Sequence, residues 1–453
     1  MKIIVLNGSP KGDVSVTMQY VAYIRKKFPE HNYEILNIAH EIRKIEKDAE
    51  VWNRTLDTIR SADLVLFAFP LYYLIVCAQF KRFIELIFER KAEDAFTGKY
   101  TGSLSTSIHF FDQTAHDYIH AISDDLGMKY LGFYSAAMYD LLLEKEQERL
   151  MKFASFLFSA VQEKMPVQRE HAPVAGPSLS YVPGIALKTI PTGSKKVVIV
   201  TDADGSSLNL AAMTNRLLKS FSGSVEMINL HDVNIKGGCL GCCQCGYDNT
   251  CVYNDGYVDF FKTRLVPADI IIIAGSVHDR YLSSAWKQFF DRSFFLGHTP
   301  GLEGKQVGFV IAGPFHQIPC LKEALTAWAD NGACHAQVVT DEVDSSGELD
   351  TLLDAMAARL MQSAEAGYIP PHTFYAVGGH KIFRDSIYGG MRLAFQADYR
   401  YYQQHGMFDF PQADLRTRSP QCSHDSLNKN PRLPEKNVCR YETPYDRPVR
   451  ART

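Results

Sequence analysis

Residues 238–255 concentrate the sulfur chemistry of this chain, because the segment GCLGCCQCGYDNTCVYND contains five of its ten cysteines. Four of them have the spacing C-x2-C-x2-C-x5-C: Cys239, Cys242, Cys245 and Cys251. Gaps of two residues let a tight loop turn several sulfurs toward one centre, as a tetrahedral metal ion or a cubane cluster requires. A disulfide pair or unliganded buried thiols are the alternatives, and Cys243 is a further thiol inside the run.

A second group of residues that could do chemistry follows the apolar run 2–6, which we expect to be a buried strand. The loop and the start of the helix expected next carry hydroxyl groups, a basic side chain and free backbone N–H groups, at Ser9, Lys11, Ser15, Val16 and Thr17. Hydroxyls and free N–H groups at a helix N-terminus suit a phosphate monoester. An ordinary capping turn is the alternative interpretation.

Two later strand ends supply further groups at the same rim of the expected sheet. The strand expected over 62–69 is followed by an aromatic turn, Pro70, Leu71, Tyr72 and Tyr73, where an isoalloxazine ring could stack. The strand expected over 102–109 ends near Ser107 and His109, where a backbone N–H could reach the edge of a flavin. Each signal alone is weak, since tyrosines often pack at a sheet rim. Together, at three adjacent strand ends, they favour a flavin mononucleotide (FMN) site.

The order of strands and helices repeats in the two halves of the chain. Apolar strands alternate with helices over 1–165 and again over 195–366, which predicts α/β domains with a parallel sheet covered on both faces. The segment ADLVLFA at 62–68 has its counterpart in ADIIIIA at 268–274, and FKRFIE at 80–85 has its counterpart in WKQFFD at 286–291. Order, spacing and local motifs repeat together, so we interpret the chain as an internal duplication of one α/β unit.

Two segments belong to neither copy. Prolines without helix or strand periodicity mark 166–194 as a linker between the domains. Residues 367–453 form a C-terminal extension, in which we expect an amphipathic helix over 388–402. Beyond Pro411 the sequence is polar and proline-bearing, which predicts an arm lying on the surface or on a partner.

The motifs resemble those of the flavodoxin-like NAD(P)H-dependent FMN reductases and, within that family, the iron–sulfur flavoproteins. NGSPKGDVSVT at 7–17 is similar to the family's phosphate loop, with Lys11 at the usual basic position, and 70–72 is similar to the turn that borders the flavin ring. The cysteine run resembles the loop that binds a 4Fe–4S cluster, and Lys287 with Asp291 and Arg292 resembles the family's Lys…Asp-Arg helix. The resemblance implies two flavodoxin-like three-layer α/β/α domains with parallel sheets of strand order 2-1-3-4-5.

The two copies depart from the family pattern in complementary ways. The first lacks the cysteine loop, since 38–47 offers His40 and charges instead. The second reads TDADGSS at 201–207, where two carboxylates would repel a phosphate, and it lacks the proline turn. Arg280 and Tyr281 could still serve a second flavin. We therefore expect FMN in the first domain and a 4Fe–4S cluster in the second, and a metal-free or zinc-bound cysteine loop is the alternative.

By resemblance, the protein is expected to be a flavin-dependent oxidoreductase or electron carrier that passes electrons between FMN and the cluster. Relatives of this kind work as oligomers, so a duplicated chain could form a pseudo-twofold arrangement within itself and set the flavin of one half against the cluster of the other. One alternative is an NAD(P)H-dependent FMN or quinone reductase without a cluster. Another, of a different class, is a redox-sensing or scaffold protein that uses the second domain and tail. No G-x-G-x-x-G motif opens either domain, so NAD(P)H use is implied by resemblance alone.

Composition and charge narrow the classes of partner and the location expected for this protein. The 453 residues carry a net charge of −3, with 46% apolar and 22% charged residues, which argues against a nucleic-acid partner. No apolar run is long enough for a membrane span and the N-terminus predicts a strand, so we expect a cytoplasmic protein, with a homodimer as one arrangement. The electron donor and acceptor stay open.

His116 and His120 lie on one face of an expected helix. Such a pair could bind a metal, but we interpret the two histidines as part of a polar surface stripe.

Overall fold

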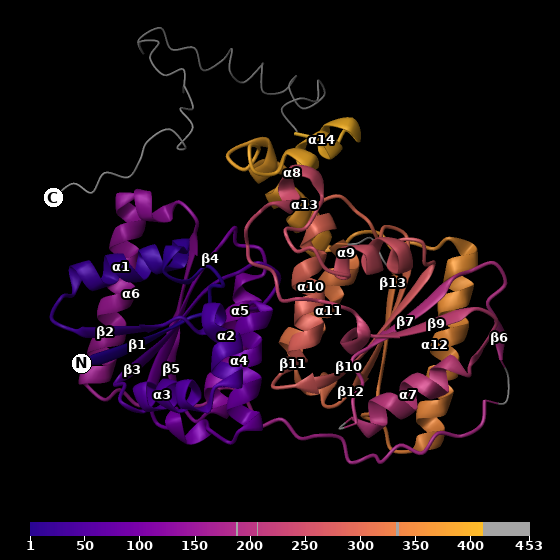
Figure 1. The fold of residues 1–453 in the computed structure, drawn as a ribbon, viewed down its shortest axis with the longest axis horizontal. Coiled ribbons are helices and arrows are strands. Elements are labelled where there is room, and N and C mark those ends of the chain that lie inside the picture. The colour runs from indigo at the N-terminus through magenta and orange to yellow at the C-terminus, as the bar shows by residue number, and fades with distance from the viewer. Residues whose placement is uncertain (187–188, 206, 332–334, 411–453) are drawn as a thin grey trace, which may run out of the picture.

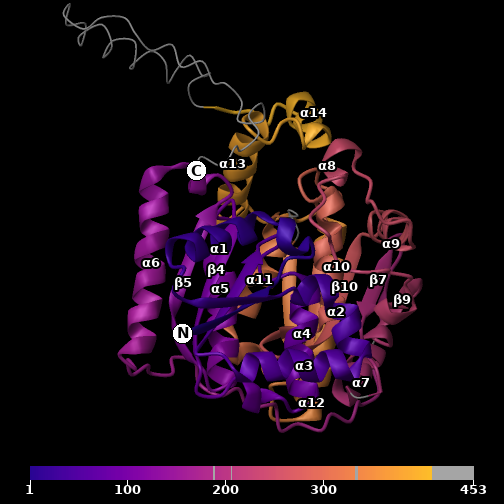
Figure 2. The same ribbon diagram turned by 60° about the vertical axis from the view of Figure 1, so that its left-hand side comes forward.

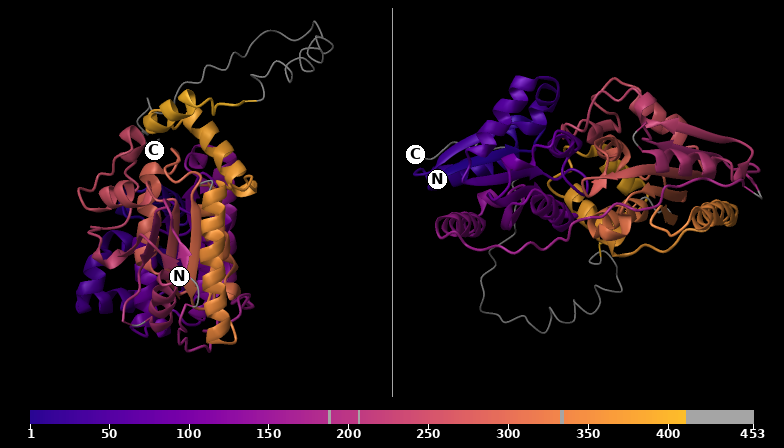
Figure 3. Two further views of the ribbon diagram at one scale, coloured as in Figure 1. Left: turned by 90° about the vertical axis from the view of Figure 1, so that its right-hand side faces the viewer. Right: turned by 90° about the horizontal axis from the view of Figure 1, so that it is seen from below.

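The computed structural model of the chain describes residues 1–186, 189–205, 207–331 and 335–410. They form two α/β domains that lie side by side, with a helical C-terminal segment above the carboxyl edges of both sheets (Figure 1). The connecting segment 163–186 runs along the opposite edge of the molecule, as Figure 1 and the view from below in Figure 3 show. The expected polar arm falls at 411–453, outside the described residues.

The first domain has a five-stranded parallel sheet of order β2-β1-β3-β4-β5, as expected. Its strands are β1 (Lys2–Asn7), β2 (Asn32–Leu36), β3 (Leu64–Pro70), β4 (Tyr100–Ser107) and β5 (Lys129–Ala137). Its helices are α1 (Val16–Lys27), α2 (Ile38–Lys47), α3 (Ala49–Arg60), α4 (Ala78–Glu89), α5 (Asp112–Asp125) and α6 (Glu144–Gln162). Successive residues of β1 alternate between two cores, because Ile3 and Val5 face α1 and α6 whereas Ile4 and Leu6 face the layer of α2 to α5.

The second domain repeats this order with a sheet β9-β7-β10-β12-β13, to which the short strand β11 (Tyr281–Leu282) adds an antiparallel edge on β10. Its parallel strands are β7 (Val197–Thr201), β9 (Val225–Asn229), β10 (Ile270–His278), β12 (Gln306–Ala312) and β13 (His335–Thr340). Its helices are α7 (Leu208–Leu218), α8 (Cys245–Asp248), α9 (Tyr257–Phe260), α10 (Ser284–Arg292), α11 (Pro319–Asn331) and α12 (Ser346–Ala366). A small separate pair joins β6 (Ile190–Pro191) to β8 (Phe221–Ser222).

The two domains share one hydrophobic core, which runs from the α2 to α5 layer of the first to the α9 to α11 layer of the second. At its centre, the duplicated helices α4 and α10 cap each other reciprocally. Asp291 of α10 accepts the backbone N–H of Ala78, the first residue of α4, at 2.7 Å. Glu85 of α4 accepts the backbone N–H of Ser284, the first residue of α10, at 2.5 Å. These pairs are equivalent in the two copies, so the contact has the pseudo-twofold symmetry that the duplication allows.

The structure corrects the expectation for the C-terminal extension. One amphipathic helix was expected over 388–402, but the chain forms α13 (Phe374–Tyr388) and α14 (Gln396–Gln404) on either side of a turn. Gly389 and Gly390 lie at the break. Glycine has the lowest helix propensity of any residue except proline, so these two positions end α13. Both helices lie above the carboxyl edges of the sheets, where α14 packs against α8 and α13 packs against α11 (Figure 2). None of the helices in the described ranges has both the length and the apolar character that crossing a membrane demands.

Candidate functional site

A cavity of about 640 Å³ opens where three parts of the chain meet. The first part is the carboxyl edge of the first domain's sheet, the second is the cysteine loop of the second domain, and the third is the helical C-terminal segment. Its volume lies in the range typical of cofactor and ligand pockets. Residues far apart in the sequence therefore line one chamber.

Most residues expected to hold FMN line this cavity. Eight of the eleven do so, namely Lys11, Ser15, Val16, Pro70, Leu71, Tyr72, Tyr73 and Ser107. Ser9 and Thr17 lie behind it, fully buried, and Thr17 Oγ1 is 2.7 Å from Thr106 Oγ1. His109 is half exposed at the rim and pairs with Asp112, since its Nδ1 lies 2.8 Å from Asp112 Oδ2. These three residues therefore support the pocket rather than form its wall.

The loop between β1 and α1 is held by its own side chains. Asn7 Oδ1 accepts the backbone N–H of Ser9 at 3.0 Å, and Ser9 Oγ accepts that of Lys11 at 3.3 Å. Ser15 is the N-cap of α1, and its Oγ accepts the N–H of Met18 at 3.3 Å. The next N–H groups, of Val16 and Thr17, are at the first turn of the helix and have no intrahelical acceptor. This turn therefore offers an anion two N–H donors, the positive end of the helix dipole and Lys11.

The aromatic turn of the first domain touches the cysteine loop of the second. A Cβ atom placed on Gly241 would lie 2.3 Å from the ring and hydroxyl of Tyr72, and Gly241 has φ of +63°. Glycine is therefore needed there for both the backbone conformation and the close approach. Gln79 Nε2 donates to the carbonyl of Cys239 at 3.2 Å, so the N-terminus of α4 also supports the loop. Burial raises the pKa of the Tyr72 hydroxyl well above its usual value.

Arg292 closes the cysteine loop at both ends. Its Nη1 donates to the carbonyl of Gly237 at 3.0 Å, and its Nη1 and Nη2 donate to the two carboxylate oxygens of Asp255 at 2.9 Å each. The guanidinium also lies over the rings of Tyr253 and Tyr257, 4.4 and 5.0 Å from their centroids. Burial alone would raise the pKa of Asp255, but the hydrogen bonds from Arg292 and from the Lys236 N–H hold it below its usual value.

All five thiols of the loop line the cavity: Cys239, Cys242, Cys243, Cys245 and Cys251. Burial raises the pKa of Cys245 to about 12 and that of Cys239 still further, and neighbouring thiols add to both shifts. Cys239 and Cys245 are therefore thiols at neutral pH in the absence of a cation. Thiolate donors in this number suit an iron–sulfur cluster or another soft metal centre.

The spacing of the thiols bears on which metal centre fits. A tetrahedral zinc ion with Zn–S bonds of about 2.3 Å would bring its sulfurs to within about 3.8 Å of one another. In the described part of the chain, three or more His, Cys, Asp or Glu ligand atoms lie within 4.8 Å of one another only at His120, Asp124 and His171. As they stand, the described cysteine thiols are therefore not gathered around a single-ion position.

The roof of the cavity contains a histidine–aspartate pair that the sequence reasoning missed. His298 Nδ1 lies 3.2 Å from Asp398 Oδ1, and both side chains are only 4% exposed. His298 also contacts the Phe383 ring, at 4.1 Å between centroids. Within the described residues, His298 Nε2 and Asp398 Oδ2 have no hydrogen-bond partner. Nothing in the sequence linked Asp398 to a histidine 100 residues earlier.

The structure changes the interpretation of three other residues, Arg280, Tyr281 and His116. Arg280 does not face a second flavin site, because its guanidinium pairs with Asp125 of the first domain, with Nη2 to Oδ1 at 2.8 Å, and donates to the carbonyl of Ala172. Tyr281 is buried in the shared core, at 1% exposure. His116 is not part of a surface stripe, because it is 1% exposed and lies within 2.8 Å of the hydroxyls of Ser103 and Ser105.

The comparisons with known proteins agree with this architecture. Residues 1–155 match the family model described as a flavodoxin-like fold, and residues 195–350 match the model of the NADPH-dependent FMN reductases. The chain is a tandem of two flavodoxin-like domains. The second domain thus matches the model of the NADPH-dependent FMN reductases, whereas the loop suited to a phosphate lies in the first domain.

Individual relatives cover single domains. An iron–sulfur flavoprotein of Archaeoglobus fulgidus is 30% identical over 106 residues, which are 23% of this chain and 47% of that protein. The match therefore spans about half the length of that relative. Among solved structures, an NADH:FMN oxidoreductase is 16% identical and covers 37% of this chain and 91% of its own, with a TM-score of 0.30. An FMN-dependent NADH-azoreductase from Bacillus anthracis is 14% identical over 34% of this chain and 98% of its own, with a TM-score of 0.27.

Proposed function

We propose that this protein is a flavin-dependent oxidoreductase in which FMN bound to the first domain exchanges electrons with a 4Fe–4S cluster held by the cysteine loop of the second. The observation that carries the proposal is the single cavity lined both by the loop, turn and strand end of the first domain and by all five thiols of the second. The family of the second domain and the iron–sulfur flavoprotein relative support the same assignment.

The first domain offers the groups that FMN needs. The phosphate would lie at the N-terminus of α1, against the N–H groups of Val16 and Thr17 and near Lys11. The ring system would lie beside Pro70 and Tyr72, with the end of β4 at Ser107 along its edge. When bound, FMN would supply two-electron chemistry, while these residues position it and exclude water.

The cysteine loop offers the ligands for the cluster. Cys239, Cys242, Cys245 and Cys251 would be its ligands, and Cys243 would stay a free thiol. Because Gly241 packs directly on Tyr72, the loop and the aromatic turn are in van der Waals contact, so the two cofactors would be close neighbours. A bound cluster would accept one electron at a time, which would let the pair link two-electron and one-electron partners.

The roof of the cavity would serve an organic acceptor such as a quinone. His298 has a buried Nε2 that has no partner among the described residues, and its Nδ1 is oriented by Asp398, so it could hold a proton at Nε2 for a reduced carbonyl oxygen. NAD(P)H is the electron donor that the second domain's family suggests. A reductase without a cluster is the second candidate, and the match of the second domain to the NADPH-dependent FMN reductases favours it.

Two matched pairs of variants test the placement of the cofactors after anaerobic purification. Ser15→Asp keeps a good N-cap but puts a carboxylate beside the phosphate position, whereas Ser15→Asn keeps the cap without the charge. We expect at least tenfold weaker FMN retention in Ser15→Asp, normal retention in Ser15→Asn and unchanged iron in both. Normal FMN in Ser15→Asp would place the flavin elsewhere.

The second pair tests the cluster. Cys242→Ser should lose iron and keep FMN, while Cys243→Ser should keep both.

A further inference from the structure

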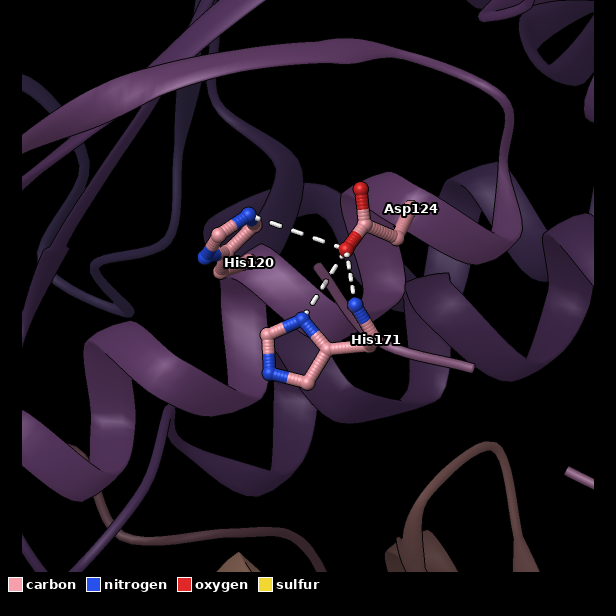
Figure 4. A group of neighbouring side chains, drawn as sticks. All are labelled: His120, Asp124 and His171. Atoms are coloured by element: carbon pink, nitrogen blue, oxygen red, sulfur yellow. Dashed lines mark hydrogen bonds and ion pairs between the residues drawn. The ribbon is translucent and has the colours of Figure 1, made fainter. Parts of the chain in front are cut away.

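We propose that His120, Asp124 and His171 form a binding site for a divalent transition-metal ion of the zinc class, remote from the cavity. His120 and Asp124 are four residues apart on α5 and therefore share one face of the helix, while His171 comes from the segment that connects the two domains. Figure 4 shows one carboxylate oxygen of Asp124 lying between the two imidazole rings. This site is independent of the function proposed for the cavity.

The ligand atoms already have nearly the spacing that a metal ion requires. His171 Nδ1 lies 2.9 Å and His120 Nε2 lies 3.6 Å from Asp124 Oδ2, and all three atoms lie within 4.8 Å of one another. Zinc bound to nitrogen and oxygen at about 2.0–2.1 Å spaces tetrahedral ligand atoms about 3.3 Å apart. The two distances to Asp124 are therefore within about half an ångström of this value, and the distance between the two histidine nitrogens is at most 4.8 Å.

The groups behind the ligands are those that support metal-bound histidines. The second nitrogen of each ring faces another carboxylate, since His171 Nε2 is 3.1 Å from Asp117 Oδ1 and His120 Nδ1 is 4.0 Å from Glu170 Oε2. Metal-binding histidines usually donate their other N–H to such a carboxylate, which fixes the tautomer and the ring orientation. This arrangement is an observation separate from the ligand spacing, and it points to the same ion.

Orientation and access also suit a metal. Asp124 is buried, and the backbone N–H groups of Glu170 and His171 donate to its Oδ2 at 3.2 and 2.9 Å. The ring of His120 stacks on Tyr130, with 4.2 Å between centroids. The side chains of His120 and His171 are 14% and 20% exposed, which leaves room for water as a fourth ligand. Two nitrogens and one carboxylate favour zinc, cobalt or nickel over calcium or magnesium.

The site would fasten the connecting segment to both domains. The residue after Asp124, Asp125, pairs with Arg169 of the connecting segment at 2.9 Å and with Arg280 of the second domain. Arg280 also donates to the carbonyl of Ala172 at 2.7 Å, next to His171. A metal ion at His171 would therefore reinforce the contact between α5, the connecting segment and the second domain.

The test uses the full chain with Cys239, Cys242, Cys245 and Cys251 all changed to serine, so that the cysteine loop cannot take the added metal. After chelation, Zn²⁺ is titrated by calorimetry, and Co²⁺ is followed by its visible absorption. We expect one ion per chain with micromolar or tighter affinity, a higher melting temperature and cobalt bands without sulfur charge transfer. In this background, His171→Ala and the more conservative His171→Asn should weaken binding at least tenfold.

The matched control is His316→Ala, which removes another histidine paired with a carboxylate, Glu342 at 2.9 Å, but one that is not among the three proposed ligands. It should bind the ion like its parent. Circular dichroism shows whether each variant is folded, and Asp124→Asn provides a second test at a different ligand. Absence of stoichiometric binding to the parent with the four serine substitutions, or equal affinity in that parent, His171→Asn and Asp124→Asn, would overturn the proposal.

Discussion

At the scale of single residues, Arg292 holds the two ends of the cysteine loop together. It joins the carbonyl of Gly237 to the carboxylate of Asp255, and the side chains of Arg292 and Asp255 are 1% and 0% exposed. A planar guanidinium can make these parallel hydrogen bonds, whereas a lysine ammonium cannot. The shape of the loop therefore depends on one side chain that lies outside it.

Replacing Arg292 should destabilise the protein. Arg292→Lys should lower the free energy of unfolding by about 2–4 kcal/mol, because it leaves Asp255 buried with a poorer partner. Urea denaturation measures this. Arg149→Lys is the control, since Arg149 pairs with Glu146 on the surface at 56% exposure and should cost less than about 1 kcal/mol. Equal losses in the two variants would contradict the role of Arg292.

The ion pair between His109 and Asp112 predicts that the stability of the protein depends on pH. Burial alone would raise the pKa of Asp112, but hydrogen bonds from His109 and Ser135 lower it from 3.8 to about 2, and the bond to Asp112 raises the pKa of His109 above 6.5. The aspartate's contribution is present above pH 3.8 and is lost as pH falls through about 2. The histidine's contribution is complete below pH 6.5 and is lost as pH rises through its folded pKa.

Asp112→Asn should therefore be most destabilising in the window between about pH 4 and 6.5, by on the order of 1–2 kcal/mol after allowance for solvent screening. Denaturation curves of the parent and the variant at several pH values give the difference directly. If the stability difference between parent and variant stays constant from pH 2 to pH 9, the ion pair between His109 and Asp112 does not make stability depend on pH.

At the scale of elements, α4 and α10 carry the contact between the domains. Lys81 with Glu85 and Lys287 with Asp291 are equivalent buried ion pairs, four residues apart in each helix. Each carboxylate also caps the partner helix, so the same residue pairs its own lysine and satisfies an N–H of the other copy.

Removing one of these charges should weaken the contact. Asp291→Asn should cost about 3–5 kcal/mol, because it leaves the ammonium of Lys287 buried and unpaired. The double variant Lys287→Met with Asp291→Asn should recover a large part of that loss, since no buried charge remains. Calorimetric melting of the three proteins measures both effects. A double variant no more stable than Asp291→Asn would contradict this account.

The strands were predictable because apolar runs and turn residues mark them, whereas their order in the sheet was implied by the family resemblance. The repeat of residues 80–85 at 286–291 located the paired helices. Helix α2 was not predicted, although Ile38, Ile42 and Ile45 have helical spacing, because charged residues and His40 stand between them. The break between α13 and α14 follows from two glycines, which the apolar count over 388–402 ignored. His171 could not be linked to His120 and Asp124, because the connecting segment has no periodicity that fixes its path.

At the scale of the whole molecule, the duplication brings complementary halves together. The first domain keeps the loop and turn suited to FMN, and the second keeps the thiols, with Asp202 buried where a phosphate loop would be. Neither half contains the whole site. The two sets of motifs predicted that the halves of the chain divide the site between them. The position of α13 and α14 over the cavity was not predicted and is seen only in the structure (Figure 2).

The most direct test is a reductive titration of the anaerobically purified protein, followed by its visible spectrum. We expect about three electrons per chain, two taken by FMN and one by the cluster. Cys242→Ser should take about two and Ser15→Asp about one. A parent protein that takes only two electrons, with Cys242→Ser identical to it, would contradict the claim that the cavity joins a flavin to an iron–sulfur cluster.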